Sequence, residues 1–239
     1  MGNLFLVRHA QASFLEQNYD KLSERGEAQA RLLGQYWVQH NVVFDGASTG
    51  PCSRQQDTAK LISDEYRKAG RKFPELQVLP EFDEYRGEAV LERSLPELLQ
   101  IDETIRDLHT TFQSSSDSAR KRVTFQKLFE AVIGKWVDGA VPLPGVETWS
   151  EFCSRVNSGL TKFLVSAERG EQLAIVTSGG PIAVAMQRAF NLSPQHTLQV
   201  SWMSPNCSWS EFLYSKERFT LSAFNSHPHL NGAAMLTYR

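Results

Sequence analysis

An arginine and a histidine, Arg8 and His9, directly follow the mainly apolar run Asn3–Val7 near the start of the chain. A guanidinium grips phosphate oxygens bidentately, and an imidazole can act as a nucleophile, acid or base. A short, continuous apolar run suits a buried central strand better than a helix of one turn. We therefore expect Arg8 and His9 at the carboxyl end of a strand, where open α/β sheets bind their ligands.

A second site of this kind follows the apolar run Leu173–Thr177, where the chain reads Ser178–Pro181. The two glycines open a helix expected over Ile182–Phe190, and the N–H groups at a helix start favour an anion. Pro181 suits the first turn of that helix, because its missing N–H is not needed there. The sequence thus places two groups of polar residues at strand ends.

Alternating elements must position these residues. Beside the two apolar strands, extended segments are expected at Asn41–Ala47 and Leu76–Phe82, with a hairpin of Ser208–Tyr214 and Phe219–Phe224. Helical spacing covers four further stretches: Lys21–His40 with Ser23 as its N-cap, Arg54–Lys68, most of Val90–Val137, and Trp149–Ala167. This alternation predicts an α/β fold, with a mainly parallel central sheet and helices on both faces.

Length and composition limit the remaining possibilities. A chain of 239 residues suits one domain that spans residues 1–239. We expect a helical insertion at about 88–144 to form a cap. The serine-rich stretch Ser114–Ser118 is a candidate for a mobile loop or a join within that insertion. With 27 acidic and 25 basic residues, the net charge of -2 indicates neither a nucleic-acid partner nor a membrane anchor. The three scattered cysteines and the lack of a signal segment favour a cytoplasmic protein.

Several short motifs resemble, in order, those of the histidine phosphatase (phosphoglycerate mutase-like) superfamily. They run from residue 3 to residue 230: Leu6–Ala12 with Arg-His, Leu22–Ala30 with Gly-x-x-Gln-Ala, Arg54–Ala59 with Arg-x-x-x-Thr-Ala, Gly145–Thr148 followed by Arg155-Val156, and Phe224–Leu230. Each motif is weak alone, but their shared order makes the resemblance specific.

The resemblance implies a phosphomonoesterase that works in two steps. His9 would be the nucleophile and become a phosphohistidine, which water then hydrolyses. Arg8 and Arg54 would bind the phosphate, since phosphoryl transfer depends mostly on positioning and charge neutralisation. The attacking imidazole must be neutral and needs a partner that fixes its tautomer. No metal or other cofactor is implied, and the expected partner is a small phosphorylated substrate.

A general acid must also protonate the leaving oxygen, and the family uses a glutamate in a Leu-x-Glu context. Two glutamates are candidates here: Glu81 has Leu79 two residues before it, whereas Glu84 has Phe82 there. We favour Glu81 as the catalytic acid and keep Glu84 as the alternative. The acid is expected to have a pKa raised by burial.

The chain departs from the family where most members have a second histidine after the later strand. Ser178 stands there, and its hydroxyl can donate one hydrogen bond but carries no charge. Losing one transition-state donor costs about 100- to 1000-fold in rate. We expect Ser178 and the backbone of Gly179 to bind phosphate, and His227 or His229 are candidates for the same pocket. If the pocket geometry is otherwise intact, Ser178→His should raise activity on a small phosphomonoester.

Two alternatives to a phosphatase stay open. A cofactor-dependent mutase ranks lower, because Tyr85–Leu91 lacks the Tyr-Gly-x-Leu-x-Gly string associated with mutases. A phospho-ligand binding protein with weakened catalysis is motivated by Ser178. The combination of Arg8, His9, Arg54 and Glu81 argues against it, because a pure binding protein needs neither a nucleophile nor an acid. The sequence identifies neither the substrate nor the oligomeric state.

Overall fold

A computed structural model describes residues 1–13, 20–232 and 234–238. The chain divides into two compact units, one formed by Met1–Glu84 with Arg155–Arg239 and the other by Tyr85–Ser154. We call them the α/β unit and the helical unit. The insertion expected at about 88–144 corresponds to the helical unit, whose bounds are wider at both ends. That the insertion caps a pocket stays a prediction.

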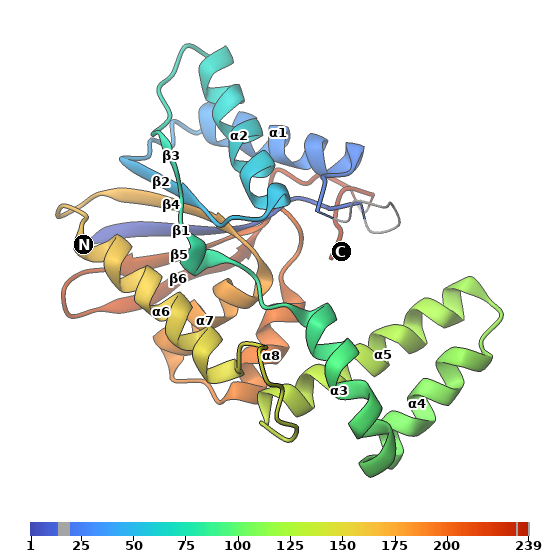
Figure 1. The fold of residues 1–239 in the computed structure, drawn as a ribbon. Helices are drawn as coiled ribbons and strands as arrows, with labels where there is room; N and C mark the ends of the chain where they lie inside the picture. The colour runs from blue at the N-terminus through green and yellow to red at the C-terminus, as the bar shows by residue number, and fades with distance from the viewer. Residues whose placement is uncertain (14–19, 233, 239) are drawn as a thin grey trace. The chain divides into compact units, whose positions relative to one another are not determined.

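The α/β unit is built on a six-stranded sheet with the order β3-β2-β4-β1-β5-β6 (Figure 1). Strands β3, β2, β4 and β1 are parallel to one another, and the hairpin β5-β6 adds two antiparallel strands beside β1. The strands are β1 (Gly2–Arg8), β2 (Gly46–Thr49), β3 (Leu76–Val78), β4 (Gln172–Thr177), β5 (Trp209–Tyr214) and β6 (Phe219–Ser226). The mainly parallel sheet is thus confirmed.

Helices cover both faces of this sheet, as the sequence predicted (Figure 1). Helices α1 (Glu24–Gln39) and α2 (Ser53–Lys68) lie together on one face. Helices α6 (Trp149–Val165) and α7 (Gly179–Phe190) lie on the other, where α8 (Pro194–Met203) packs against α7. A short 3-10 helix, η1 (Pro80–Phe82), follows β3.

Burial on both faces explains why β1 reads as a continuous apolar run. Phe5 and Val7 belong to a core cluster that also holds Trp37 of α1. The Phe5 and Trp37 rings meet edge to face at 6.0 Å between centroids. Leu4 and Leu6 alternate with these residues and are equally buried. Successive side chains of a strand point to opposite faces, so both faces of β1 must be apolar.

Local backbone features account for where α1 and β2 begin. Ser23 caps α1 as expected, because its hydroxyl accepts a hydrogen bond from the backbone N–H of Gly26 at 3.0 Å. The strand expected from Asn41 instead begins at Gly46, because Asn41 adopts a left-handed conformation with φ 55° just after α1. The expectation for this strand was wrong at its start, since composition does not show where a turn ends.

The helical unit consists of α3 (Gly87–Ile101), α4 (Glu103–Ser114) and α5 (Ser118–Val137). Asp102 and Asp117 cap α4 and α5 by accepting from the backbone N–H groups of Ile105 and Arg120. Residues 115–117 of the serine-rich stretch connect α4 and α5, and the mobility expected of this stretch stays a prediction. Among the residues that the structure describes, no helix is long and apolar enough to cross a membrane.

Candidate active site

His9 and Ser178 leave the sheet side by side. Arg8, the last residue of β1, is in register with Thr177, the last residue of β4. The backbone N–H of His9 then donates to the carbonyl of Thr177 at 2.7 Å. The two strand ends that carried polar residues in the sequence therefore form one site at the carboxyl edge of the parallel strands, as such sheets favour.

The tautomer of His9 follows from its contacts. Its ring is buried, and Nδ1 lies 2.8 Å from the carbonyl oxygen of Ala10, which can only accept a hydrogen bond. Nδ1 therefore carries the proton in the neutral ring, and Nε2 carries the lone pair. Nε2 lies 3.2 Å from Nε of Arg54, which donates to it. The imidazole is thus oriented with the lone pair of Nε2 toward an arginine.

Burial and neighbouring charge also keep this imidazole neutral. Desolvation lowers the pKa of His9 well below its usual value, and the positive charges of Arg54 and Arg8 lower that pKa further. A positive ring would be costly in a buried site beside two guanidinium groups. His9 is therefore in the protonation state that nucleophilic attack requires.

Arg54 is held beside His9 by the first turn of α2 and by Thr58. The Thr58 hydroxyl donates to the carbonyl of Arg54 at 2.6 Å and accepts from the backbone N–H of Ala10 at 3.0 Å. One threonine thus ties the start of α2 to the residue after the histidine. This contact gives a physical reason for the Arg-x-x-x-Thr spacing seen in the sequence.

Asp20 also fixes the Arg54 side chain, which is only 11% exposed. Its carboxylate accepts from Nη1 of Arg54 at 2.7 Å and from the backbone N–H of Ser53 at 2.6 Å. The second contact places a negative charge at the N-terminus of α2, where the helix dipole favours it. Our sequence reasoning missed Asp20, because nothing in its spacing links it to a helix more than thirty residues later.

Arg8 contacts backbone carbonyls. Its guanidinium donates to the carbonyl of Ser204 and, at 2.9 Å, to that of Tyr238. Its charge still reaches the imidazole, because Arg8 is among the groups that lower the pKa of His9. The structure therefore places both predicted phosphate-binding arginines near the histidine, with Arg54 in direct contact.

The two candidate acids have different surroundings. The carboxylate of Glu81 pairs with Lys162 of α6 at 2.9 Å, and this contact lowers the pKa of Glu81. This direction is opposite to the raised pKa expected of a general acid. The carboxylate of Glu84 instead accepts from the backbone N–H of Gly180 at 3.0 Å, at the start of α7. Glu84 is therefore the glutamate that lies beside the residues following β4.

Arg155 of α6 holds the segment Glu81–Glu84 in place. Its Nη1 donates to the carbonyls of Glu81 at 2.9 Å and Asp83 at 3.1 Å. Gly159, one turn further along α6, leaves room for the Glu81 side chain, because a Cβ atom there would clash with it. The segment is thus clamped with Glu81 facing α6 and Glu84 facing α7.

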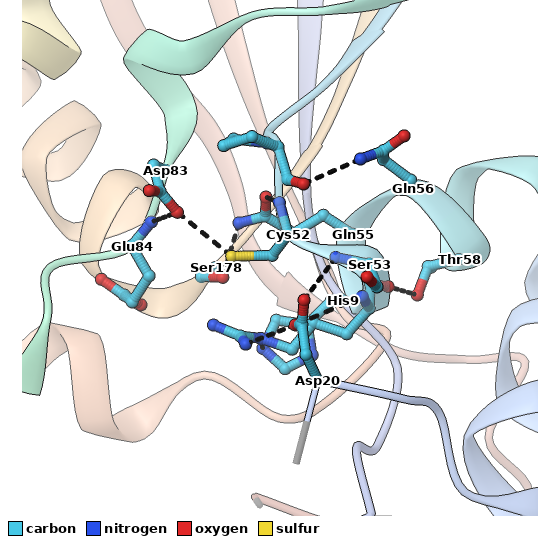
Figure 2. Close-up of polar contacts among 12 residues, drawn as sticks. His9, Asp20, Cys52, Ser53, Gln55, Gln56, Thr58, Asp83, Glu84 and Ser178 are labelled. Carbon is cyan, nitrogen blue, oxygen red and sulfur yellow. Dashed lines mark hydrogen bonds and ion pairs between the residues drawn. The ribbon is translucent and has the colours of Figure 1, made fainter. Parts of the chain in front are cut away.

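Ser178 is almost fully buried, and its hydroxyl accepts a hydrogen bond from Nε2 of Gln55 at 2.8 Å (Figure 2). Gly179 follows as the first residue of α7, packed so closely on the backbone of Ser201 that a side chain there would clash. The backbone N–H next along the helix, that of Gly180, is the one that binds Glu84. Gln55 is a second residue that sequence reasoning missed, although it lies inside the Arg-x-x-x-Thr motif.

The surroundings of Cys52 and His229 do not suit either side chain to phosphoryl transfer. Burial raises the pKa of the Cys52 thiol to about 12, and the thiol donates to Asp83, so Cys52 is not a competing nucleophile. His229 was a candidate for the pocket, but it is buried in the core and stacks on Trp209 at 5.6 Å. Within the described part of the chain, no cluster of His, Cys, Asp or Glu is suited to holding a metal ion.

The sequence profile of the histidine phosphatase superfamily (branch 1) matches residues 4–118 and 124–227. The chain therefore belongs to this superfamily, as its motifs suggested. No curated protein sequence matches the chain significantly.

Solved structures show the same fold at low sequence identity. A putative alpha-ribazole-5'-P phosphatase from Escherichia coli has a TM-score of 0.62 and 19% identity, over 95% of this chain and 98% of that one. YhfR from Bacillus stearothermophilus has a TM-score of 0.65 and 17% identity, over 96% and 99%. A phosphoserine phosphatase from Entamoeba histolytica, bound to phosphoserine, has a TM-score of 0.59 and 19% identity, over 96% and 100%.

Proposed function

We propose that this protein hydrolyses small phosphate monoesters through a phosphohistidine formed on Nε2 of His9. The observation that carries the proposal is the state of this ring: Nδ1 is bonded to the carbonyl of Ala10, and Nε2 bears a lone pair that faces Arg54. A buried, neutral imidazole beside guanidinium groups suits attack on phosphorus and stabilisation of the transferring phosphoryl group.

In the first step, Nε2 of His9 attacks phosphorus, and the bond between phosphorus and the ester oxygen breaks. Arg54 donates to Nε2 at rest, and a phosphate oxygen takes over as the acceptor of that hydrogen bond when substrate binds. Arg54 and Arg8 offset the charge of the phosphoryl group, and Ser178 donates to one of its oxygens. The leaving alkoxide takes its proton from a carboxyl group.

We assign the role of proton donor to Glu84 in place of Glu81. The bond from Gly180 holds the Glu84 carboxyl group beside the residues that follow β4, whereas Glu81 is committed to Lys162. In the second step, Glu84 accepts a proton from water, the water oxygen attacks phosphorus, and the phosphorus–nitrogen bond breaks. Inorganic phosphate leaves, and His9 returns to its neutral state.

The test is turnover of p-nitrophenyl phosphate by the purified full-length protein and its His9→Ala variant. We expect the wild-type protein to turn over this ester and the His9→Ala variant to show no turnover. With a 32P-labelled phosphate ester, we also expect the wild-type protein to carry labelled phosphohistidine after a rapid quench without acid. Turnover that survives in His9→Ala would contradict the proposal. Tight phosphate binding without turnover would support a binding protein, and transfer to added phosphoglycerate in preference to water would support a mutase.

The relatives of known name suggest which esters to test first. They include phosphatases described for alpha-ribazole-5'-phosphate, phosphoserine and glucosyl-3-phosphoglycerate. The leaving groups of these esters differ widely. The three phosphatases resemble this chain in fold, at 15–19% sequence identity. A panel that combines these esters with sugar and nucleoside monophosphates would identify the preferred leaving group by kcat/KM.

A further inference from the structure

We infer that Gln55 is a positioning residue that acts through Ser178, by turning the hydroxyl hydrogen of that serine toward the bound phosphate. The inference rests on the proposed function, since it concerns the donor that stands in place of a second histidine. The buried side-chain amide of Gln55 has neighbours that identify which of its atoms is the oxygen and which is the nitrogen.

The orientation of the Gln55 amide is determined by groups that cannot exchange roles. Its Oε1 accepts from the backbone N–H of Cys52 at 3.1 Å, which can only donate. Its Nε2 lies 3.3 Å from the carbonyl oxygen of Phe82, which can only accept. A flipped amide would place two donors and two acceptors face to face. The NH2 group of Gln55 must therefore face Ser178.

This arrangement decides how the Ser178 hydroxyl is used. Nε2 of Gln55 donates to Ser178 Oγ at 2.8 Å, so the serine oxygen is an acceptor in that contact and its own hydrogen points elsewhere. Ser178 does not cap α7 with its side chain, and among the described residues its hydroxyl donates no hydrogen bond. A buried hydroxyl hydrogen of this kind needs an acceptor. Since Ser178 leaves the sheet beside His9, a phosphate oxygen is the acceptor that fits.

The geometry also explains how a serine can serve at this position. A serine hydroxyl alone rotates freely and loses part of its binding energy when it is ordered. The Gln55 amide orders it before the substrate arrives, because the amide itself is held by Cys52 and Phe82. Preorganised donors contribute most to stabilising charge in the transition state. Gln55 and Ser178 thus act as one donor unit.

A double-mutant cycle on p-nitrophenyl phosphate turnover tests this coupling. Gln55→Met removes both amide ends, and we expect it to lower kcat about tenfold, more than it changes KM. In a Ser178→Ala background, the same substitution should lower kcat less than about threefold, because the group that Gln55 orients is gone. An equal loss in both backgrounds, or no loss in Ser178→Ala itself, would overturn the inference.

Two further variants distinguish the proposed effect on Ser178 from a general loss of structure. Gln55→Glu keeps the acceptor for Cys52 but cannot donate to Ser178, so we expect a loss of kcat that is smaller in the Ser178→Ala background. Gln56→Met is the matched control, because Gln56 is an exposed neighbour whose amide bonds the carbonyl of Pro51; it should leave kcat unchanged. A loss in Gln56→Met equal to that in Gln55→Met would also contradict the inference.

Failure of the proposed function can be separated from failure of this inference. If the wild-type protein shows no turnover that depends on His9, binding of inorganic phosphate by calorimetry replaces kinetics as the measurement. Gln55→Met should then weaken phosphate binding about threefold or more in the wild type and not in Ser178→Ala. Unchanged binding in the wild-type background would reject the role of Gln55.

Discussion

The imidazole of His9 meets two separate conditions for attack on phosphorus. One is a fixed tautomer, which the carbonyl of Ala10 provides, and the other is a low pKa, which burial and two arginines provide. Both conditions come from residues near in space. The two candidate acids likewise differ in their neighbours, because Glu84 accepts from the backbone N–H of Gly180, whereas Glu81 pairs with Lys162.

The choice between the two glutamates can be measured directly. We expect Glu84→Gln to lower kcat by about 100-fold or more for an ester with a poor leaving group, because the departing alkoxide loses its proton donor. The loss should be much smaller for p-nitrophenyl phosphate, whose leaving group needs no proton. Glu81→Gln is the matched control and should retain most activity; the reverse pattern would restore Glu81 as the acid.

The structure changes what we expect of Ser178→His. Ser178 is buried against the Gln55 amide, so an imidazole at this position would collide with that amide. We therefore expect Ser178→His alone to lower kcat/KM, and Ser178→His with Gln55→Ala to recover part of the loss. A single Ser178→His variant with raised kcat/KM would show that the pocket accommodates the larger ring.

At the scale of elements, the Gly-x-x-Gln-Ala motif of α1 supports the segment that follows His9. Gly26 packs so closely on the backbone of Gln11 that a Cβ atom would overlap its carbonyl oxygen. Gln29, one turn further, accepts from the N–H of Gln11 at 2.9 Å and donates to the carbonyl of Met235 at 2.7 Å. The motif thus connects α1, the loop after β1 and the C-terminal segment.

Gly26→Ala tests this close contact. The added methyl group meets backbone atoms that cannot rotate away, so we expect the free energy of unfolding to fall by about 1–3 kcal/mol. Gly134→Ala in α5 is the control: its methyl group would meet open space, and it should raise stability by about 0.5–1 kcal/mol. Denaturant unfolding of both variants measures the difference, and equal effects would contradict the close approach of α1 to Gln11.

At the scale of the whole molecule, two buried histidines make stability depend on pH. Burial lowers the pKa of His229 from 6.5 to about 3, and His9 is lowered in the same direction. Below about pH 6.5 the unfolded chain therefore binds protons that the folded chain excludes. Since protons then favour the unfolded state, stability is full above pH 6.5 and declines as the pH falls.

Because its pKa in the folded protein is about 3, His229 contributes a loss of about 1.4 kcal/mol per pH unit between about pH 6 and pH 4.5, and His9 adds a loss in the same direction. Urea unfolding at several pH values should show this fall in the free energy of unfolding. In His229→Leu, the fall per pH unit should be smaller by the contribution of His229. An unchanged slope in His229→Leu would mean that His229 is protonated in the folded protein. His9→Ala provides the corresponding measurement for the other ring.

Much of the molecule was predictable from the sequence, for physical reasons that differ by element. Apolar runs such as Leu173–Thr177 predict buried strands, and the alternation with helices predicts a covered parallel sheet. The cap at Ser23 was also readable, because its partner Gly26 lies three residues away. Helix α8 and the true start of β2 were not expected, since a short polar helix and a turn leave weak periodic signals.

By itself the sequence determined the fold class, the family, and the placement of Arg8, His9 and Arg54 at one edge of a sheet. Those features depend on local periodicity and on motifs whose order is visible along the chain. Only the tertiary structure decided which glutamate contacts Gly180, that Asp20 pairs with Arg54, and that the amide of Gln55 donates to Ser178. Such contacts join residues far apart in the chain, and packing in three dimensions alone determines which side chains meet.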